Sequence, residues 1–233
     1  MLFGKRKRSA GRMSQSASLR QLRGRGVPVA AVLDVGVQRA TGPLIEVFPD
    51  VPHLLFEPVR AFYPDIRRNY ANIRHEIVEA AICDVDGAGK IEAAMIDGKD
   101  VSHAWISTRG EEVRLARLDT IVPTYDFKGP YLLKIDVDGA AIPAKIIDGA
   151  EGVMADVSCV VCEMVADRFT DLAARIEKHG FSLWDIVECC YYDDVFYQCD
   201  AVFVRKDVLR SAPKLKPFDF RTFDPAKWRT ATG

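Results

Sequence analysis

The sequence has no long apolar run and no excess of charge of either sign. Its 233 residues carry a net charge of −1, so the composition gives no reason to expect a nucleic-acid partner. No segment is apolar over a length that would suit a signal peptide or a membrane span. The sequence therefore predicts a cytoplasmic protein with no membrane span and no nucleic acid among its partners.

Cysteine is too scarce to build a disulfide framework. Six cysteines in a chain of this size, without a secretory signal, are expected to be free thiols. Cys159 and Cys162 have the C-x-x-C spacing, but they lie in an apolar run typical of a strand, where alternation points the two sulfur atoms to opposite faces. No second pair completes a zinc site, so we expect no metal.

Acidic residues are absent from the N-terminus, where lysine and arginine are frequent and Asp34 is the first acid. We interpret residues 1–17 as a basic flexible tail, since a run of like charge is usually solvated. Hydrophobic residues make up 48% of the chain, enough for one large core, and residues 18–207 are expected to form one α/β domain. Residues 208–233, with prolines among aromatics, are expected to wrap the surface as a C-terminal tail.

A short apolar run, residues 30–35, ends in Asp-x-Gly and indicates a buried parallel strand followed by a helix. Gly36 has no Cβ, so a cofactor can lie against the backbone there, and the following helix offers free N–H groups. Asp34 supplies a hydrogen-bond acceptor. The dinucleotide pattern G-x-G-x-x-G would need glycine where Gln38 stands, which disfavours NAD.

Acidic residues recur where the later predicted strands end. Glu57 closes the second strand, 21 residues after Gly36, and in doubly wound folds an acid at this distance can bind both ribose hydroxyls of an adenosine. Asp136 and Asp138 follow the apolar strand 131–135, and two carboxylates at a strand tip are costly unless they bind something. The acids at the ends of predicted strands are Asp34, Glu57, Asp84, Asp136 and Glu163.

Predicted strands and helices alternate along the chain and end in an antiparallel pair, residues 181–187 and 201–204. This order is typical of a doubly wound, Rossmann-like α/β sheet that is mostly parallel with a terminal antiparallel hairpin. Ligands of such sheets bind beyond the carboxyl ends of the strands, where the five acids fall. The polar segment 97–110, which contains His103, is long for a loop and is a candidate lid.

Four stretches of the chain resemble the FkbM family of S-adenosylmethionine-dependent methyltransferases. The resemblance runs from about Leu19 to Arg205, and its most specific part is a lysine followed by an acid-x-acid-Gly-Ala turn and a later Gly-Ala. The four stretches are Leu33-Asp34-Val35-Gly36, Phe56-Glu57-Pro58, Leu118-Asp119-Thr120, and Leu133 to Ala140 with Gly149-Ala150 after its helix.

This resemblance implies a class I methyltransferase fold, S-adenosylmethionine as cofactor, and methyl transfer to a hydroxyl of a small-molecule or glycan acceptor such as a sugar. It places Asp34, Gly36 and the same loop's Gln38 beside the methionine part of the cofactor. By position, the ribose would be bound by Glu57, the adenine would lie near Ala81 and Asp84, and the amino-acid part would lie near Asp136.

Methyl transfer to a hydroxyl needs alignment of the reacting atoms and a base that removes the hydroxyl proton. We expect one of three residues to supply that base, because they lie at predicted strand tips or in the candidate lid. These residues are Asp138, Glu163 and His103.

The chain departs from the FkbM pattern at two places. Gln38 and Ala40 replace an asparagine and a glycine of the first loop, and the Cβ of Ala40 lies where the backbone should approach the cofactor. Ala141 replaces the second acid of the family's Glu-Gly-Ala-Glu turn. Either change fits a variant substrate or a lost activity.

Two other functions remain open from the sequence. Asp136 and Asp138 have the D-x-D spacing with which some sugar-nucleotide glycosyltransferases hold a divalent metal, although that function leaves Asp34, Gly36 and Glu57 without a task. The altered first loop also fits a non-catalytic relative that binds a partner. The edge of the terminal hairpin offers a surface for a homo-oligomer.

Overall fold

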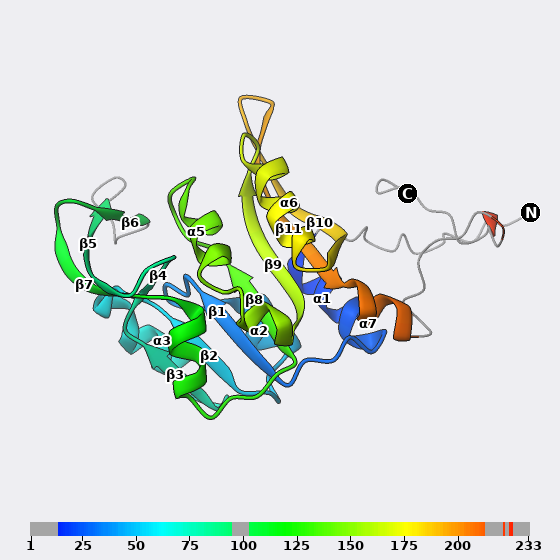
Figure 1. Ribbon diagram of the computed structural model, residues 1–233, viewed down its shortest axis with the longest axis horizontal. Coiled ribbons are helices and arrows are strands. Elements are labelled where there is room, and N and C mark those ends of the chain that lie inside the picture. Colours follow the sequence, from blue (N-terminus) through cyan, green and yellow to red (C-terminus); the bar gives the residue numbers. More distant parts are fainter. Residues whose placement is uncertain (1–13, 95–102, 213–220, 222–223, 226–233) are drawn as a thin grey trace, which may run out of the picture.

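The chain folds around a seven-stranded sheet, whose strands lie next to one another across the centre of Figure 1. This computed structural model describes residues 14–94, 103–212, 221 and 224–225. The strand order is β10-β11-β9-β8-β1-β2-β3, and β11 pairs in the antiparallel sense with both of its neighbours, β10 and β9, while the other pairs are parallel. The strands are β1 (Ala31–Val35), β2 (His53–Phe56), β3 (His75–Val78), β8 (Tyr131–Ile135), β9 (Val157–Val165), β10 (Phe181–Tyr192) and β11 (Val195–Arg205).

This topology confirms the predicted doubly wound, Rossmann-like sheet with a terminal antiparallel hairpin. Strand order reverses at β1, which lies between β2 and β8, so the switch point falls where the first Asp-x-Gly loop leaves the sheet. The four apolar runs that form β1, β2, β8 and β9 are short and nearly all buried, as expected for parallel strands covered on both faces.

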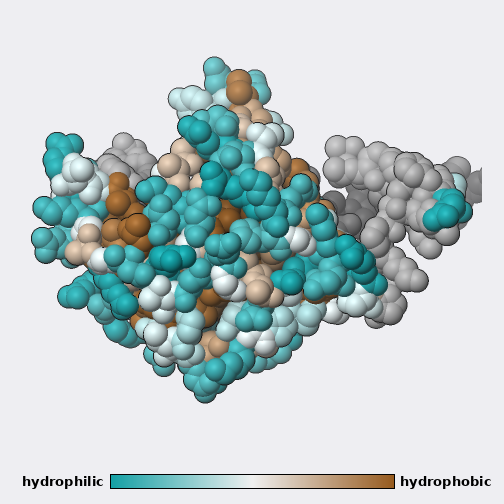
Figure 2. Space-filling model, in the orientation of Figure 1, coloured by the Kyte–Doolittle hydropathy of each residue, from teal (hydrophilic) through white to brown (hydrophobic). Residues whose placement is uncertain are grey.

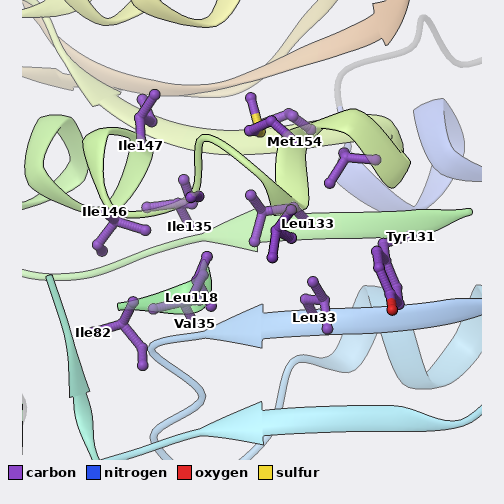
Figure 3. Packing of buried hydrophobic residues seen from close by; sticks show 14 of the residues in the cluster. Leu33, Val35, Ile82, Leu118, Tyr131, Leu133, Ile135, Ile146, Ile147 and Met154 are labelled. Atoms are coloured by element: carbon purple, nitrogen blue, oxygen red, sulfur yellow. The ribbon is translucent and has the colours of Figure 1, made fainter. Parts of the chain in front are cut away.

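Helices cover both faces of the sheet. On one face, α5 and α6 pack against Leu33, Leu133 and Ile135, and Figure 3 shows Ile146 and Ile147 of α5 above these strands. On the other face, α1, α2 and α7 pack against the alternate residues of the same strands, among them Val32 and Leu132. The helices are α1 (Gln15–Gly24), α2 (Gly42–Val47), α3 (Tyr63–Asn69), α4 (Leu118–Ile121), α5 (Ile142–Asp148), α6 (Phe169–Lys178) and α7 (Lys206–Ser211), with the 3-10 turns η1 (Arg60–Phe62), η2 (Val122–Thr124) and η3 (Val153–Asp156).

A second, four-stranded sheet corrects two sequence predictions. The strand predicted over residues 77–83 is divided, because β3 ends at Val78 and β4 joins the second sheet. The candidate lid is in part a strand, β6, which pairs with β5, while its residues 97–102 lie outside the described part of the chain. The strands of this sheet are β4 (Ala81–Ile82), β5 (Gly87–Ala94), β6 (His103–Ser107) and β7 (Glu111–Ala116), in the order β4-β7-β5-β6.

The packed part of the chain includes segments near both ends. Leu19 of α1 is fully buried and Leu209 of α7 is 9% exposed, and both belong to the same apolar cluster. The domain limits stay a prediction, and most residues of the two predicted tails lie outside the described ranges.

The surface view shows mostly hydrophilic residues over the face presented in Figure 2. Among the residues that the structure describes, no helix combines the length and the apolar character needed to cross a membrane. The larger exposed apolar side chains gather on β10 and β11, where Tyr191 is 66% and Tyr192 79% exposed.

Replacing a core leucine tests whether the central sheet carries the stability of the fold. Leu133 is fully buried between β8 and the helices, so Leu133→Ala should lower the free energy of unfolding by about 2–5 kcal/mol. Leu183 on β10 is 44% exposed, and Leu183→Ala should change it by less than about 1 kcal/mol. Urea denaturation measures both, and equal effects would contradict the described packing.

Candidate functional site

A row of charged side chains crosses one face of the sheet near the carboxyl ends of its strands. Asp34 of β1 lies opposite Lys134 of β8, and Glu163 of β9 lies opposite Asp200 of β11. Asp136 follows Lys134 by two residues, so alternation places it on the same face. Strand register thus brings four carboxyl groups, from four positions far apart in the sequence, to a single lysine.

Lys134 holds the middle of this row. Its side chain is 4% exposed, and its Nζ donates to Asp136 Oδ2 at 2.6 Å and lies 3.9 Å from Asp34 Oδ1. Burial disfavours the charged ammonium, but Asp136 and Asp34 outweigh it and raise the pKa of Lys134. For Asp136, burial is likewise outweighed by Lys134, and its pKa lies below the ordinary value.

Lys134 had no predicted role of its own. The available signal was a lysine inside an otherwise apolar strand, with an acid two residues later, since a buried ammonium needs a partner on its own face.

Asp34 lies beneath the first loop and is fully buried. Its Oδ2 accepts a hydrogen bond from the hydroxyl of Tyr70 at 3.3 Å, and that hydroxyl also accepts from the backbone N–H of Thr41 at 3.1 Å. Oδ1 has no hydrogen-bond donor in the described part of the chain. Burial raises the pKa of Asp34, while Lys134 and Thr41 act in the opposite direction.

Glu57 holds the same loop from the other side. Its Oε2 accepts from the backbone N–H of Gln38 at 2.7 Å and its Oε1 from that of Val59 at 2.9 Å. The residue is 3% exposed, and burial raises its pKa to about 7. Both oxygens therefore hold the chain's own backbone in this structure, and a contact between Glu57 and a ribose stays a prediction.

Gly36 is required for a reason that the sequence did not reveal. Its φ is +86°, and a Cβ added there would lie 1.8 Å from the carbonyl oxygen of Asp136. The missing Cβ therefore makes room for the loop that follows β8. Gln38 has a φ of +49°, a conformation that asparagine or glycine adopts more readily, so the departure from the FkbM pattern costs backbone energy here.

The carboxyl groups of Glu163 and Asp136 lie side by side, because Ile135 lies opposite Cys162 and these two acids are the next residues, so one can donate a hydrogen bond to the other when it is protonated. Burial first, and then the neighbouring Asp136, raises the pKa of Glu163 to about 8. The side-chain amide of Gln198 on β11 donates to Glu163 Oε1. Asp200 accepts from Gln15 of α1 at 2.8 Å, and burial raises its pKa to about 6.

Pockets adjoin this row on two sides. A polar pocket of about 360 Å³ is lined by the loop 36–43, Lys134, Asp136, Glu188 and Asp200, and its volume is in the range of small-molecule sites. A second pocket of about 160 Å³ is lined in part by Asp138, Glu163, Pro143, Leu172, Tyr197 and Gln198. Asp136 faces the first pocket and Glu163 the second, so this pair of acids lies between them.

The structure brings together some of the predicted site residues and separates others. Ala81 lines a small apolar pocket of about 50 Å³ together with Gly36 and Asp138. Asp84 lies apart from these three pockets and pairs instead with Lys145 at 3.7 Å, because β4 has left the main sheet. His103 begins β6, and its side chain is not among those described. Within the described residues, no three of His, Cys, Asp and Glu are placed to hold a metal ion.

Comparison with known proteins finds similarity in structure only. No protein-family model and no curated protein matches the chain. Magnesium protoporphyrin IX methyltransferase from Synechocystis, crystallised with bound S-adenosylmethionine, is 11% identical with a TM-score of 0.46, over 82% of this chain and 79% of that one. The fibrillarin pre-rRNA processing protein of Methanococcus jannaschii is 11% identical with a TM-score of 0.47, over 76% and 66%.

Since no family model matches, the likeness to the FkbM family stays a resemblance carried by the residues quoted above. The fold assignment is based on the strand order of this chain. The sequence-based exclusion of nucleic acid as a partner is corrected, because a pre-rRNA processing protein is among the similar structures.

Gly36→Ala tests the close approach of the two loops. The added Cβ would meet the Asp136 carbonyl oxygen, and alanine tolerates the positive φ poorly, so we expect a loss of at least about 2 kcal/mol in the free energy of unfolding. Gly42→Ala is the matched control, since nothing lies within 4 Å of its added Cβ. Thermal and urea unfolding of both variants measure the difference, and a neutral Gly36→Ala would refute the described contact.

Lys134→Met tests the charge balance of the row. Removing the ammonium leaves buried carboxylates without their cation, so we expect a loss of about 3–5 kcal/mol at pH 7. Because the pKa of Asp136 is lower in the folded protein, its ion pair with Lys134 stabilises the fold at any pH above the ordinary aspartate pKa, and this stabilisation is lost as the pH falls through the folded-state pKa. The loss of stability caused by Lys134→Met should therefore become smaller at about pH 4 and below, where the carboxyl groups take up protons.

Urea denaturation as a function of pH measures this deficit. Lys178→Met, on the exposed end of α6, is the control and should change stability by less than about 0.5 kcal/mol at every pH. A Lys134→Met protein as stable as the wild type at pH 7 would contradict the role given to this lysine.

Proposed function

We propose that the chain is an S-adenosylmethionine-dependent methyltransferase that methylates a hydroxyl group, on a sugar or a similar product as the FkbM resemblance implies. The observation that carries the proposal is the excess of carboxyl groups over cations in the row of charged side chains next to the polar pocket. Arg39 also lines this pocket, but its guanidinium pairs with Asp65 of α3. Asp34, Asp136, Glu163 and Asp200 share the single ammonium of Lys134.

The residues present fit a positively charged methyl donor. Asp34 Oδ1 is buried without a hydrogen-bond donor in the described chain, and burial raises the pKa of both Glu163 and Asp200. Each of these features indicates a carboxyl group whose ionised form lacks a full counter-charge inside the protein. A cation in the adjoining pocket would relieve this imbalance.

Particular residues would hold the donor. Asp34 and Asp136 supply negative potential, the loop 36–43 supplies backbone groups that line the polar pocket, and Ala81 supplies an apolar wall. When bound, S-adenosylmethionine supplies an activated methyl group on a positively charged sulfur. The chain's own part is to hold the acceptor oxygen in line and to take its proton.

Glu163 is the base that this geometry supports best. It lines the smaller pocket, and Gln198 orients one of its oxygens. Asp138 lines the same pocket and remains an alternative base. His103 also remains an alternative base, as proposed from the sequence. The D-x-D glycosyltransferase alternative is less well supported, since Asp136 is bound by Lys134 at 2.6 Å.

Isothermal titration calorimetry of the full chain tests the proposed donor. S-adenosylmethionine should bind with one-to-one stoichiometry, and Asp136→Asn should weaken binding about tenfold, since it removes a charge beside the pocket. Glu177→Gln, on the exposed side of α6, should leave the affinity unchanged. Manganese-dependent binding of a sugar nucleotide, with no binding of S-adenosylmethionine, would overturn the proposal in favour of the glycosyltransferase.

A further inference from the structure

Asp136 and Glu163 place two carboxyl groups side by side in the site. Two adjacent carboxylates repel each other and can only accept hydrogen bonds, so the pair favours a form in which one carboxyl group carries a proton and donates it to the other. Parallel register supports the contact, because Ile135 lies opposite Cys162 and the next residues along both strands are these two acids.

The partners of each carboxyl group identify the one that holds the proton. Asp136 accepts from the Lys134 ammonium at 2.6 Å, which favours its ionised form. Among the residues that the structure describes, no cation forms an ion pair with Glu163, and its Oε1 accepts from the neutral amide of Gln198. The proton therefore belongs to Glu163.

The charges that face this pair come from every neighbouring strand and are nearly all negative. β1 contributes Asp34 and β8 contributes Lys134, while β11 contributes Asp200 next to Glu188 of β10. The thiol of Cys162 points to the opposite, apolar face of β9, where burial first, and then the charges of the nearby acids, raise its pKa. Among the described residues, Lys134 is the cation that forms ion pairs within this group of acids.

Resting on the proposed function, we propose that Glu163 is protonated in the free protein and releases its proton to solvent when the positively charged methyl donor binds, so that donor binding itself creates the base. Asp136 lines the larger pocket and lies beside Glu163, which lines the smaller one, so charge in the first pocket acts on both acids. A full positive charge within about 6 Å lowers a carboxyl pKa by roughly 1–3 units.

Glu163 also takes up the proton that the acceptor hydroxyl loses in the reaction. The acceptor oxygen forms a bond to the methyl carbon, the carbon–sulfur bond breaks with its electron pair left on sulfur, and the hydroxyl proton goes to the Glu163 carboxylate. The sulfur loses its positive charge as Glu163 becomes neutral. The protein then returns to the protonated pair that it prefers without a cation.

Calorimetry in buffers of different ionisation enthalpy tests this inference. At pH 7, binding of S-adenosylmethionine should release roughly 0.4–0.9 proton, because Glu163 with a pKa of about 8 is mostly protonated in the free protein and a lowering by roughly 1–3 units removes part or most of that proton. S-adenosylhomocysteine, whose sulfur is neutral, should release almost none. Affinity for S-adenosylmethionine should rise by up to about tenfold per pH unit below pH 8 and should level off above it.

Two variants separate Glu163 from the other acids. Glu163→Gln keeps a donor to Asp136 and should still bind S-adenosylmethionine, but it should lose the proton release. Glu177→Gln on the outer side of α6 should release as many protons as the wild type. Release that persists in Glu163→Gln, or equal release with the neutral thioether, would overturn the inference.

Carboxyl carbon NMR of the free protein gives a second measurement that needs no donor. The Glu163 signal, assigned by its disappearance in Glu163→Gln, should show a protonated group at pH 7. Ionisation near the ordinary glutamate range would refute the inference while leaving donor binding intact. Absence of S-adenosylmethionine binding would instead end the proposed function, and this inference with it.

Discussion

The lysine in the middle of the central sheet is the constraint on which the rest of the site depends. A buried ammonium is tolerated only beside carboxylates, and Lys134 lies between Asp34 on the neighbouring strand and Asp136 on its own. Those two acids close β1 and β8, the strands at the switch point of the sheet. Lys134 therefore links the two central strands at the point where their loops leave the sheet, and it places charged groups beside the adjoining pocket.

The first loop shows how closely the site is tied to the core. Tyr70 of the crossover segment joins Thr41 to Asp34, and Glu57 fixes Gln38, so buried groups hold the loop in two places. Gly36 lets the loop after β8 approach to a distance that any side chain would prevent. The pocket is thus formed by backbone held in place from beneath, which is the preorganisation that a ligand site on a parallel sheet needs.

Much of this arrangement could be predicted from the sequence, because it depends on local patterns. Apolar runs that end in acids gave the strands, their direction and the edge at which Asp34, Asp136 and Glu163 meet. Asp84 did not join them because β4 pairs in the second sheet, and long-range pairing of that kind leaves no local signal. The roles of Tyr70 and Gln198 were missed for the same reason, since each depends on a partner from another strand or helix. Lys134 did have a local signal, because its closest partner, Asp136, follows two residues later.

The most direct test of the account is a crystal structure of the chain grown with S-adenosylmethionine. The account predicts electron density for the donor in the pocket between the loop 36–43 and the Lys134–Asp136 pair, with its positive sulfur on the side of the carboxyl row. Density at another place on the protein, or a pocket that stays closed by the chain's own side chains at saturating donor, would contradict it.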